Sequence, residues 1–338
     1  MRIIEAGFTI LPTPHTRAEI LKHIERCGRV CYKSEDKITE DSAKKFVAGI
    51  IRRGHDAVLE HGSLCVRMPS IMRKIPMFHS KMKTEVWYAQ AITSMERCDP
   101  GYTPYRNYLR FSIDNCSYMP IISGNIRSWR SFFEAYHEQF LWIPREFLPL
   151  IRQNPVLLGQ YAQYIADDVG IEAAIIPAED LSDTARELHQ DVSVLFKVDR
   201  GISHEIVRHR LASYCQESTR YCDYSVGRFG SEITVIEPKA LQHTPGYKIW
   251  MDSCKRAETA YFDLLNCGCS PQEARGVLPN SLKTEIVMTA NLTEWRHFFQ
   301  LRTSRAAHPQ MREVAIPLLR EFKKRDPENF DDIQEDKA

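Results

Sequence analysis

The stretch that decides how this chain is interpreted is Ser203-His-Glu-Ile-Val-Arg-His-Arg-Leu-Ala-Ser-Tyr-Cys-Gln-Glu-Ser-Thr-Arg-Tyr221. Its apolar residues, together with Ile202, recur at helical spacing and predict a largely buried helix over residues 202–213. Arg208 and Arg210 would then be buried, and buried arginines require anionic partners. A guanidinium group matches phosphate through two parallel hydrogen bonds. Residues 218–220 add two hydroxyls and a third guanidinium, so the stretch predicts a site for a phosphorylated ligand.

A zinc site is not expected in this stretch. His204-Glu205 resembles the start of a HExxH motif, but Arg208 stands where the second histidine is needed. His209 lies five residues after His204, off the helix face that would share a metal ion with it. The ten cysteines show no pair of CxxC motifs, and we expect reduced thiols that have no catalytic or metal-binding role.

Composition narrows the class of protein further. The 338 residues carry 45 Lys and Arg against 44 Asp and Glu, so the formal net charge is +1. A broad basic field for nucleic-acid polymers is therefore not expected, and any anion site must be local. No apolar run approaches the length of a membrane helix, and the first residues lack the pattern of a signal peptide. These features favour a cytoplasmic enzyme that binds neither nucleic-acid polymers nor membranes.

Working outward from the central stretch, helical and strand patterns alternate, which predicts an α/β or α+β fold. The expected helices follow Thr16, cover about 40–53, 125–142 and 246–265, and cover 292–302 and 310–324. The expected strands are 63–68, 108–113, 119–123, 193–198 and 233–236, and residues 283–290 are either extended or helical. The last residues, 326–338, are polar and are expected to fray.

One internal similarity is visible. Gly124-Asn-Ile-Arg-Ser-Trp-Arg-Ser-Phe-Phe133 is identical at half of its positions to Ala290-Asn-Leu-Thr-Glu-Trp-Arg-His-Phe-Phe299. Asn125 and Asn291 would each be a good N-cap. The pattern is compatible with a partial duplication or with the chance reuse of an Asn-capped aromatic helix.

Arg208-His-Arg, seven residues and Ser218 resemble the RHRx7S signature of the flavin-dependent thymidylate synthases, the ThyX family. Leu59-Glu-His61, Arg29-Val-Cys-Tyr32 and the ordered residues Ala274-Arg275 to Arg312-Glu313 resemble further blocks of that family. The resemblance covers about 15–68 and 192–325. It implies a ThyX-like mixed sheet flanked by helices, formed by 1–68 and 192–325, with residues 69–191 as a long insertion and 326–338 as a polar tail.

The resemblance implies the reductive methylation of dUMP to dTMP. Methylenetetrahydrofolate would give the carbon, and FAD reduced by NADPH would give the hydride, with no cysteine nucleophile. The family also implies a homotetramer whose active sites lie at subunit junctions. Two alternatives stay open: the same fold and cofactors acting on another pyrimidine nucleotide such as UMP, and a non-catalytic nucleotide-binding homologue.

Family roles can be transferred residue by residue. Arg302 would contact the uracil ring, where a permanent cation stabilises negative charge, and His61 would lie near the flavin and folate. The positions that match substrate contacts are Glu205, Arg208, Gln216, Ser218, Thr219 (through its backbone), Arg220, Arg275 and Arg302. The positions that match flavin contacts are Ser63, His209, Arg210, Gln216, Asn291 and His297.

The chain departs from the commoner family pattern at several of these positions. Glu205 and Gln216 stand where Gln and Glu are frequent, and Cys215 where Asn is frequent. Thr293 and His297 stand where the family has Arg and Asn. A carboxylate at Glu205 would repel a phosphate unless an arginine lies between them. The insertion could cover the site, add an interface or rebuild the folate pocket.

Overall fold

The computed structural model describes residues 1–67, 109–113, 120–140, 143, 145–165, 174–177, 180–226 and 230–335. The chain divides into two compact units, which are described separately. Unit 1 comprises Met1–Thr13, Arg26–Lys37 and Val192–Ala338, and unit 2 comprises Pro14–Glu25 and Ile38–Asp191. The mixture of helices and sheets confirms the predicted α/β or α+β class.

Unit 1 is built around a four-stranded sheet in the order β2-β7-β10-β8. The strands are β2 (Gly7–Ile10), β7 (Asp191–Asp199), β10 (Lys283–Asn291) and β8 (Ser213–Gln216). β2 pairs antiparallel with β7, and β8 pairs antiparallel with β10. Residues 283–290, which the sequence left open between strand and helix, are therefore extended.

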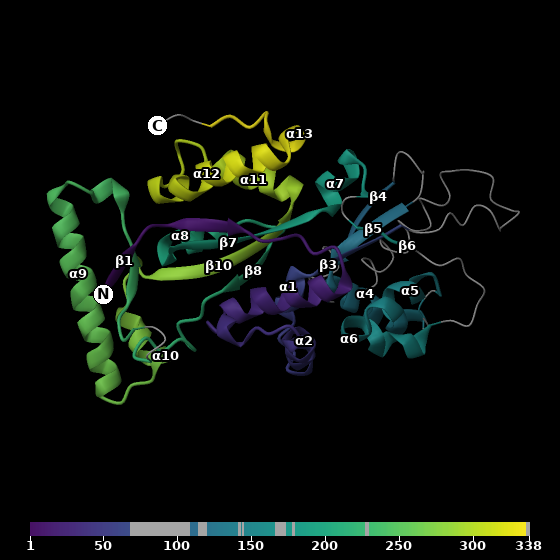
Figure 1. Cartoon of the computed structure of the whole chain (residues 1–338), viewed down its shortest axis with the longest axis horizontal. Helices are drawn as coiled ribbons and strands as arrows, with labels where there is room; N and C mark the ends of the chain where they lie inside the picture. Colours follow the sequence, from purple (N-terminus) through teal and green to yellow (C-terminus); the bar gives the residue numbers. More distant parts are fainter. Residues whose placement is uncertain are drawn as a thin grey trace, which may run out of the picture. The chain divides into compact units, whose positions relative to one another are not determined.

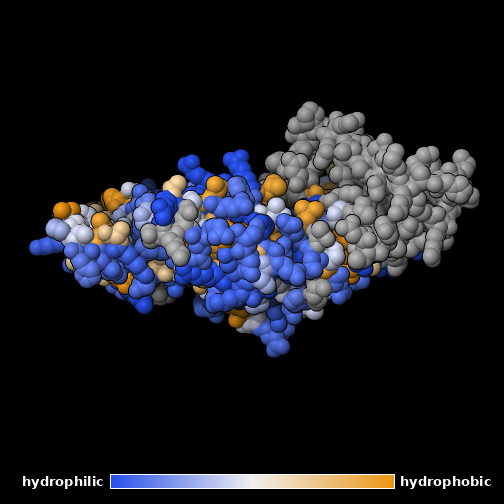
Figure 2. Space-filling model, turned by 90° about the horizontal axis from the view of Figure 1, so that it is seen from above, coloured by the Kyte–Doolittle hydropathy of each residue, from blue (hydrophilic) through white to orange (hydrophobic). Residues whose placement is uncertain are grey.

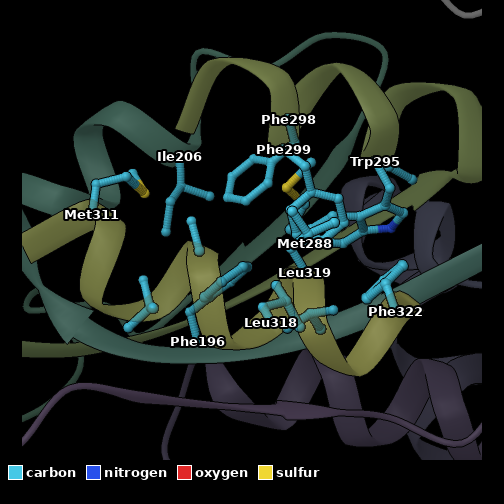
Figure 3. Close-up of a cluster of buried hydrophobic side chains, with 14 of the residues drawn as sticks. Phe196, Ile206, Met288, Trp295, Phe298, Phe299, Met311, Leu318, Leu319 and Phe322 are labelled. Atoms are coloured by element: carbon cyan, nitrogen blue, oxygen red, sulfur yellow. The ribbon is translucent and has the colours of Figure 1, made fainter. Parts of the chain in front are cut away.

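Helices α8 (Arg200–Ile206), α11 (Leu292–Arg302), α12 (Pro309–Arg325) and α13 (Pro327–Phe330) surround this sheet (Figure 1). Every second residue of β7 from Val194 to Val198 is buried, as the two-residue period of a strand requires. These side chains meet Trp295, Phe298, Phe299 and Phe322 in one apolar core (Figure 3). The core fixes α11 against the sheet and thereby fixes the position of its last residue, Arg302.

The predicted polar tail is partly wrong. Phe330 and Ile333 are buried in the same core, and Arg296 forms an ion pair with Asp332 at 2.6 Å. Residues 326–335 therefore pack against the domain instead of fraying. The sequence suggested a tail because only these two apolar side chains stand among many charged ones.

A second part of unit 1 contains the parallel pair β1 (Arg2–Ile4) and β9 (Thr234–Ile236). The long helix α9 (Pro245–Asn266) and the short helix α10 (Pro271–Ala274) pack against this pair (Figure 1). Tyr261 and Cys254 of α9 lie in its core. The short 3-10 helices η1 (Glu35–Lys37), η9 (Lys239–Leu241) and η10 (Arg275–Val277) complete unit 1.

Unit 2 has its own four-stranded sheet in the order β4-β5-β3-β6. Its strands are β4 (Arg110–Ile113), β5 (Pro120–Asn125), β3 (Ser63–Arg67) and β6 (Ala174–Ile175). The α-helices are α2 (Ser42–Arg52), α4 (Ile126–Phe140), α5 (Leu148–Gln153), α6 (Pro155–Leu158), α7 (Asp183–His189) and the first part of α1 (Arg17–Val30). The 3-10 helices are η2 (Asp56–His61), η5 (Arg145–Phe147) and η6 (Gly159–Tyr164).

The expected elements of unit 2 correspond to observed ones, with small changes at their ends. The predicted strand ends at Tyr108 and Met119 and the helix end at Trp142 lie outside the described residues. The division into units does not coincide with the predicted boundary at residue 68, because Ile38–Arg67 groups with the described part of 69–191. Residues 69–191 as an insertion in a ThyX-like domain remain a prediction.

The internal similarity is structural as well as sequential. β5 runs into α4, and β10 runs into α11, at the same aligned position. Asn125 Oδ1 accepts a hydrogen bond from the Ser128 amide at 2.8 Å, and Asn291 Oδ1 accepts one from the Glu294 amide at 2.9 Å. Each chain segment therefore forms the same strand, asparagine cap and helix.

The aligned tryptophans make the same contact. Trp129 Nε1 donates to the carbonyl of Leu64, the second residue of β3, at 3.2 Å. Trp295 Nε1 donates to the carbonyl of Val192, the second residue of β7, at 3.0 Å. Two chance sequence matches would not be expected to share cap, indole partner and neighbouring strand, so the structure favours a partial duplication.

The coloured part of the surface in Figure 2 is mainly hydrophilic, with hydrophobic positions in small separate spots. Within the described ranges, no helix is long and apolar enough to cross a membrane.

Candidate active site

Arg302 is the last residue of α11, and its position follows from how that helix is built. Asn291 caps the first turn, and Trp295, Phe298 and Phe299 are fully buried along one side. The helix therefore has little freedom to rotate. A cation at a helix C-terminus is favourable because the last carbonyl groups carry partial negative charge.

The guanidinium group of Arg302 is held by two residues of the central stretch. Its Nη1 donates to Glu205 Oε2 at 2.8 Å, and its Nη2 donates to the Glu205 carbonyl oxygen at 3.0 Å. Its Nε donates to His209 Nε2 at 2.9 Å. An arginine has five N–H groups, so these three bonds fix the plane of the group and leave two donors for a ligand.

Glu205, which was expected to repel an anionic ligand unless an arginine lay between them, does have an arginine as its partner. The Glu205 carboxylate is paired with Arg302, so the arginine that the sequence argument required is present. Glu205 therefore contacts the predicted catalytic residue and can orient it, in addition to any contact with substrate.

The central stretch is not one buried helix, and that prediction was wrong. α8 ends at Ile206, and Tyr214 Oη lies 2.9 Å from the carbonyl oxygen of Ile206 and 2.8 Å from that of His209, so its single proton is shared between them. The Ile206 carbonyl also accepts from the His209 amide at 3.2 Å, in a turn and not in a further helical turn. Val207 and Leu211 are 39% and 58% exposed, so the apolar residues used to predict burial lie partly at the surface.

The three residues of the Arg-His-Arg tripeptide lie in different environments. Arg208 and Arg210 are exposed and form no ion pair with any carboxylate in the described ranges. His209 is buried, with 3% of its surface exposed. Arg208 and Arg210 are therefore not buried as predicted, but two exposed guanidinium groups on either side of His209 in the chain still provide positive charge for an anionic ligand.

A second group of predicted residues lies after β8. Arg275 Nη1 donates to the Thr219 hydroxyl at 3.5 Å, and the Arg220 amide donates to the Ser218 hydroxyl at 3.3 Å. Arg220 and Arg275 are exposed, whereas Thr219 is buried. The group thus combines two surface guanidiniums with hydroxyls, which suits a phosphate.

Gln216, the last residue of β8, is turned toward its own sheet. Its side-chain amide donates to the hydroxyls of Ser203 at 2.9 Å and Thr284 at 3.2 Å. These bonds tie β8 to α8 and β10. Gln216 is therefore well placed to hold the two groups of site residues in register, whatever it contacts in a ligand.

An ion-pair network next to Gln216 was not predicted. Lys283 contacts both Glu217 and Glu285 at 2.8 Å, and Lys33 contacts Glu285 at 2.7 Å. Burial opposes ionisation of Glu285, but Lys283 and Lys33 outweigh it and lower the pKa of this carboxyl. The residues are separated by up to 252 positions in sequence, so their spacing gave no signal.

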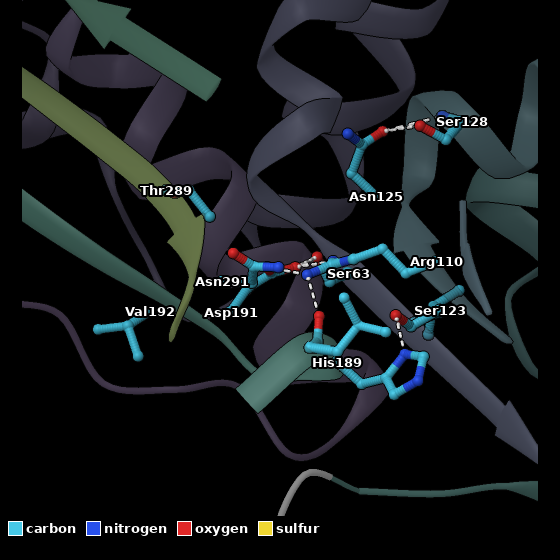
Figure 4. Close-up of polar contacts among 12 residues, drawn as sticks. Ser63, Arg110, Ser123, Asn125, Ser128, His189, Asp191, Val192, Thr289 and Asn291 are labelled. Carbon is cyan, nitrogen blue, oxygen red and sulfur yellow. Dashed lines mark hydrogen bonds and ion pairs between the residues drawn. The ribbon is translucent and has the colours of Figure 1, made fainter. Parts of the chain in front are cut away.

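His61 and Ser63 belong to unit 2 and are described with it. His61 ends η2 and is buried. The Ser63 hydroxyl donates to Asp191 Oδ2, and Arg110 donates to both carboxylate oxygens of Asp191 at 2.7 Å (Figure 4). Burial would raise the pKa of Asp191, but Arg110 and Ser63 hold it below its usual range.

His189 lies beside this ion pair, and no role was predicted for it from the sequence. Its two ring nitrogens contact the hydroxyls of Ser112 and Ser123 at 2.8 and 2.7 Å (Figure 4). Burial and the neighbouring Arg110 lower the pKa of His189 to about 4. His189 is therefore a neutral imidazole near pH 7.

Residues 187–328 match the sequence profile of the family described as thymidylate synthase complementing protein. This part of the chain is therefore similar in sequence to that family. Residues 187–328 contain both groups of site residues, whereas His61 and Ser63 lie outside the matched range.

The chain is also similar to curated proteins. A flavin-dependent thymidylate synthase of Pyrococcus furiosus is 37% identical over 128 residues, covering 38% of this chain and 52% of the relative. Proteins with the same name from Geobacter sulfurreducens and Corynebacterium glutamicum are 35% and 31% identical over 136 and 153 residues. Each match covers 40% of this chain and 57% or 59% of the relative. The chain thus spans little more than half the length of these relatives.

Proposed function

We propose that this protein is a flavin-dependent thymidylate synthase that converts dUMP to dTMP. The observation that carries the proposal is the geometry of Arg302 inside the family segment. Its guanidinium is fixed by Glu205 and His209, and two N–H donors remain for a substrate. A fixed cation of this kind stabilises negative charge on a uracil ring and so favours reaction at C5.

The phosphate and sugar of dUMP would be held by Arg208, Ser218, Thr219, Arg220 and Arg275. The exposed guanidinium of Arg275 and the hydroxyl of Thr219 are already in contact. Orienting the nucleotide lets part of its binding free energy lower the barrier of the chemical step. Glu205 and Gln216 contribute by holding Arg302 and β8 in place.

FAD would supply the hydride, after reduction by NADPH, and methylenetetrahydrofolate would supply the carbon. The residues fit a diphosphate cofactor in part, because the guanidinium of Arg210 and the ring of His297 are exposed. Asn291 uses Oδ1 to cap α11, so a flavin contact there would involve another atom. Ser63, His61, His209 and Gln216 complete the set that the family resemblance suggests.

Self-association as a homotetramer is part of the proposal. Val207, Leu211 and Tyr221 are large apolar side chains that flank the two groups of site residues, and each is more than a third exposed. Exposed apolar residues around a site are typical of a surface that a second subunit covers. A cytoplasmic location is also part of the proposal.

The proposal is tested by flavin binding and turnover together. We expect purified protein to bind FAD, to show flavin absorbance, and to form dTMP from dUMP, methylenetetrahydrofolate and NADPH. Protein that neither contains nor takes up FAD and forms no dTMP would refute it. FAD and dUMP binding without any turnover would support the alternative of a non-catalytic homologue.

A further inference from the structure

A buried carboxylate, Glu294, lies next to His209, one of the two residues that hold Arg302, and next to His297. Glu294 Oε1 is 3.4 Å from His209 Nδ1 and 3.5 Å from His297 Nδ1. Glu294 is 9% exposed and His209 3% exposed. Neither Glu294 Oε1 nor His209 Nδ1 has a hydrogen-bond partner that meets normal geometry within the described residues. No role was predicted for Glu294.

The position of the protons decides what this cluster can do. Arginine nitrogens only donate hydrogen bonds, so His209 Nε2, which faces Arg302 Nε at 2.9 Å, must be the unprotonated acceptor. A neutral His209 in this contact would carry its proton on Nδ1, which lies 3.4 Å from Glu294 Oε1. Glu294 is thus close enough to favour a proton on Nδ1, although the two atoms do not form a hydrogen bond of normal geometry.

The same three side chains could in principle hold a metal ion. One ligand atom of each of His209, Glu294 and His297 lies within 4.8 Å of the others. A metal on His209 Nδ1 would require the proton on Nε2, as in most histidine ligands. That proton would point at the donor Nε of Arg302, so the contact observed with Arg302 disfavours a metal here.

The duplicated segment serves as an internal control for the role of Glu294. At the aligned positions of α4, Ser128 replaces Glu294, Ser131 replaces His297 and Tyr136 replaces Arg302. The aligned asparagine, tryptophan, arginine and two phenylalanines are kept. Ser128 completes the helix cap with its own amide and hydroxyl bonds to Asn125 Oδ1.

This strand–helix element therefore forms without a carboxylate. A buried carboxylate costs free energy unless it is paired, and Glu294 stands only in the segment that has Arg302. We propose that Glu294 is a positioning residue: it keeps the proton of His209 on Nδ1, and so keeps Nε2 free to hold Arg302. The proposal rests on the proposed function for its effect on turnover, but its effect on His209 can be measured alone.

The direct test is the tautomer of His209. In 15N-histidine-labelled full-length protein near pH 7, protonated and unprotonated ring nitrogens give separate resonances, and His209→Gln identifies the signal. We expect protonated Nδ1 in the unmodified protein and in Glu294→Gln, whose amide oxygen still accepts the proton. In Glu294→Ser, the residue of the duplicated segment, we expect protonated Nε2 to appear.

Kinetics provide the second readout. Glu294→Ser should lower kcat about 10-fold to 100-fold through a misplaced Arg302, with KM for dUMP changed less than threefold, and Glu294→Gln should restore most of the loss. Gln300→Ala, exposed on the same helix, is the control and should change neither. A protonated Nε2 in the unmodified protein, or an unchanged tautomer in Glu294→Ser, would overturn the proposal. Micromolar binding of Zn²⁺ that both Glu294 variants lose would overturn it in favour of a metal site.

If neither the unmodified protein nor any variant forms dTMP, the proposed function is wrong. The ring-nitrogen resonances of His209 would still show whether Glu294 sets the tautomer of His209.

Discussion

At the residue scale, the proposed role of Arg302 depends on the shape of its guanidinium group as much as on its charge. Its three protein contacts use Nε, Nη1 and Nη2 at the same time. A lysine has one nitrogen at the end of a flexible chain and cannot make this set of contacts. The chemistry proposed for the site therefore needs an arginine, and charge alone does not suffice.

We predict that Arg302→Ala and Arg302→Lys both lower kcat for dTMP formation by about 100-fold to 1000-fold, the loss typical of a removed electrostatic donor. FAD should remain bound, because Arg302 is not among the predicted flavin contacts. Steady-state kinetics with a parallel flavin absorbance measurement check this. A lysine variant with more than a tenth of the original kcat would show that charge alone suffices.

His189 provides a pH prediction for unit 2. Its pKa is about 4 in the folded protein and about 6.5 in an unfolded chain. Between these values the unfolded chain binds the proton more readily, so stability is lost as the pH falls from about 6.5 to about 4. The full effect corresponds to about 3 kcal/mol. Asp191, whose pKa is also lowered, adds a loss only at more acidic pH.

Urea unfolding of the whole protein at pH 7 and pH 4.5 measures this loss. In His189→Gln, which cannot take up a proton, the difference in unfolding free energy between the two pH values should shrink by most of its magnitude. His204→Gln, an exposed histidine, is the matched control and should keep the difference of the unmodified protein. If the unfolding free energy depends on pH equally in all three proteins, His189 is not the cause of the loss of stability at low pH.

Arg302, Ser218 and Arg275 were predicted as site residues from motif spacing. Glu294, His189 and the ion pairs of Lys283 were not predicted. Motifs record residues that face a ligand. Glu294 and His189 instead support other side chains, and their partners are distant in sequence. The i,i+3 spacing of Glu294 and His297 on a helix was the one available signal, because such residues share a face.

At the scale of elements, helix α11 was predicted at its observed bounds, while the predicted C-terminal end of α8 lies seven residues beyond the observed one. α11 combines an asparagine cap, a regular aromatic face and a cationic end, all of which are local signals. The end of α8 depends on Tyr214, whose hydroxyl contacts the carbonyls that a longer helix would have used. A tertiary contact of this kind leaves no local pattern.

The two asparagine caps give a prediction at this scale. Asn291→Ala and Asn125→Ala should each lower the unfolding free energy by about 1 kcal/mol, because each removes the side-chain oxygen that caps the first turn of its helix. Only Asn291→Ala should also reduce turnover, since α11 carries Arg302 and α4 carries Tyr136 at the aligned position. Denaturation and activity assays on both variants check this, and an equal loss of activity in the two would contradict it.

At the scale of the whole molecule, near-zero net charge conceals a local excess of cations. Arg208, Arg210, Arg220 and Arg275 are all exposed within the family segment. The composition predicts no broad basic field, and the motif predicts that these arginines serve one site; both stay predictions. The sequence also showed the internal similarity but could not decide between duplication and chance, because the shared hydrogen bonds appear only in the fold.

Exposed apolar residues next to the site give the prediction for assembly. Leu211→Glu places a charge on a side chain that is 58% exposed in the single chain. If a second subunit covers it, the variant should elute at a smaller mass in light-scattering chromatography and lose activity with it. Val226→Glu, 48% exposed on another loop, is the comparison. A tetramer unaffected by Leu211→Glu would place the interface elsewhere.

The proposed conversion of dUMP to dTMP is tested most directly by identifying the product that the protein forms. Protein loaded with FAD should be given methylenetetrahydrofolate, NADPH and an equal mixture of dUMP and UMP, and the nucleotides should be analysed by mass spectrometry. We expect the unmodified protein to form dTMP and no methylated UMP, and we expect Arg302→Ala to form no dTMP. Methylated UMP as the main product, or dTMP formed equally well by Arg302→Ala, would contradict it.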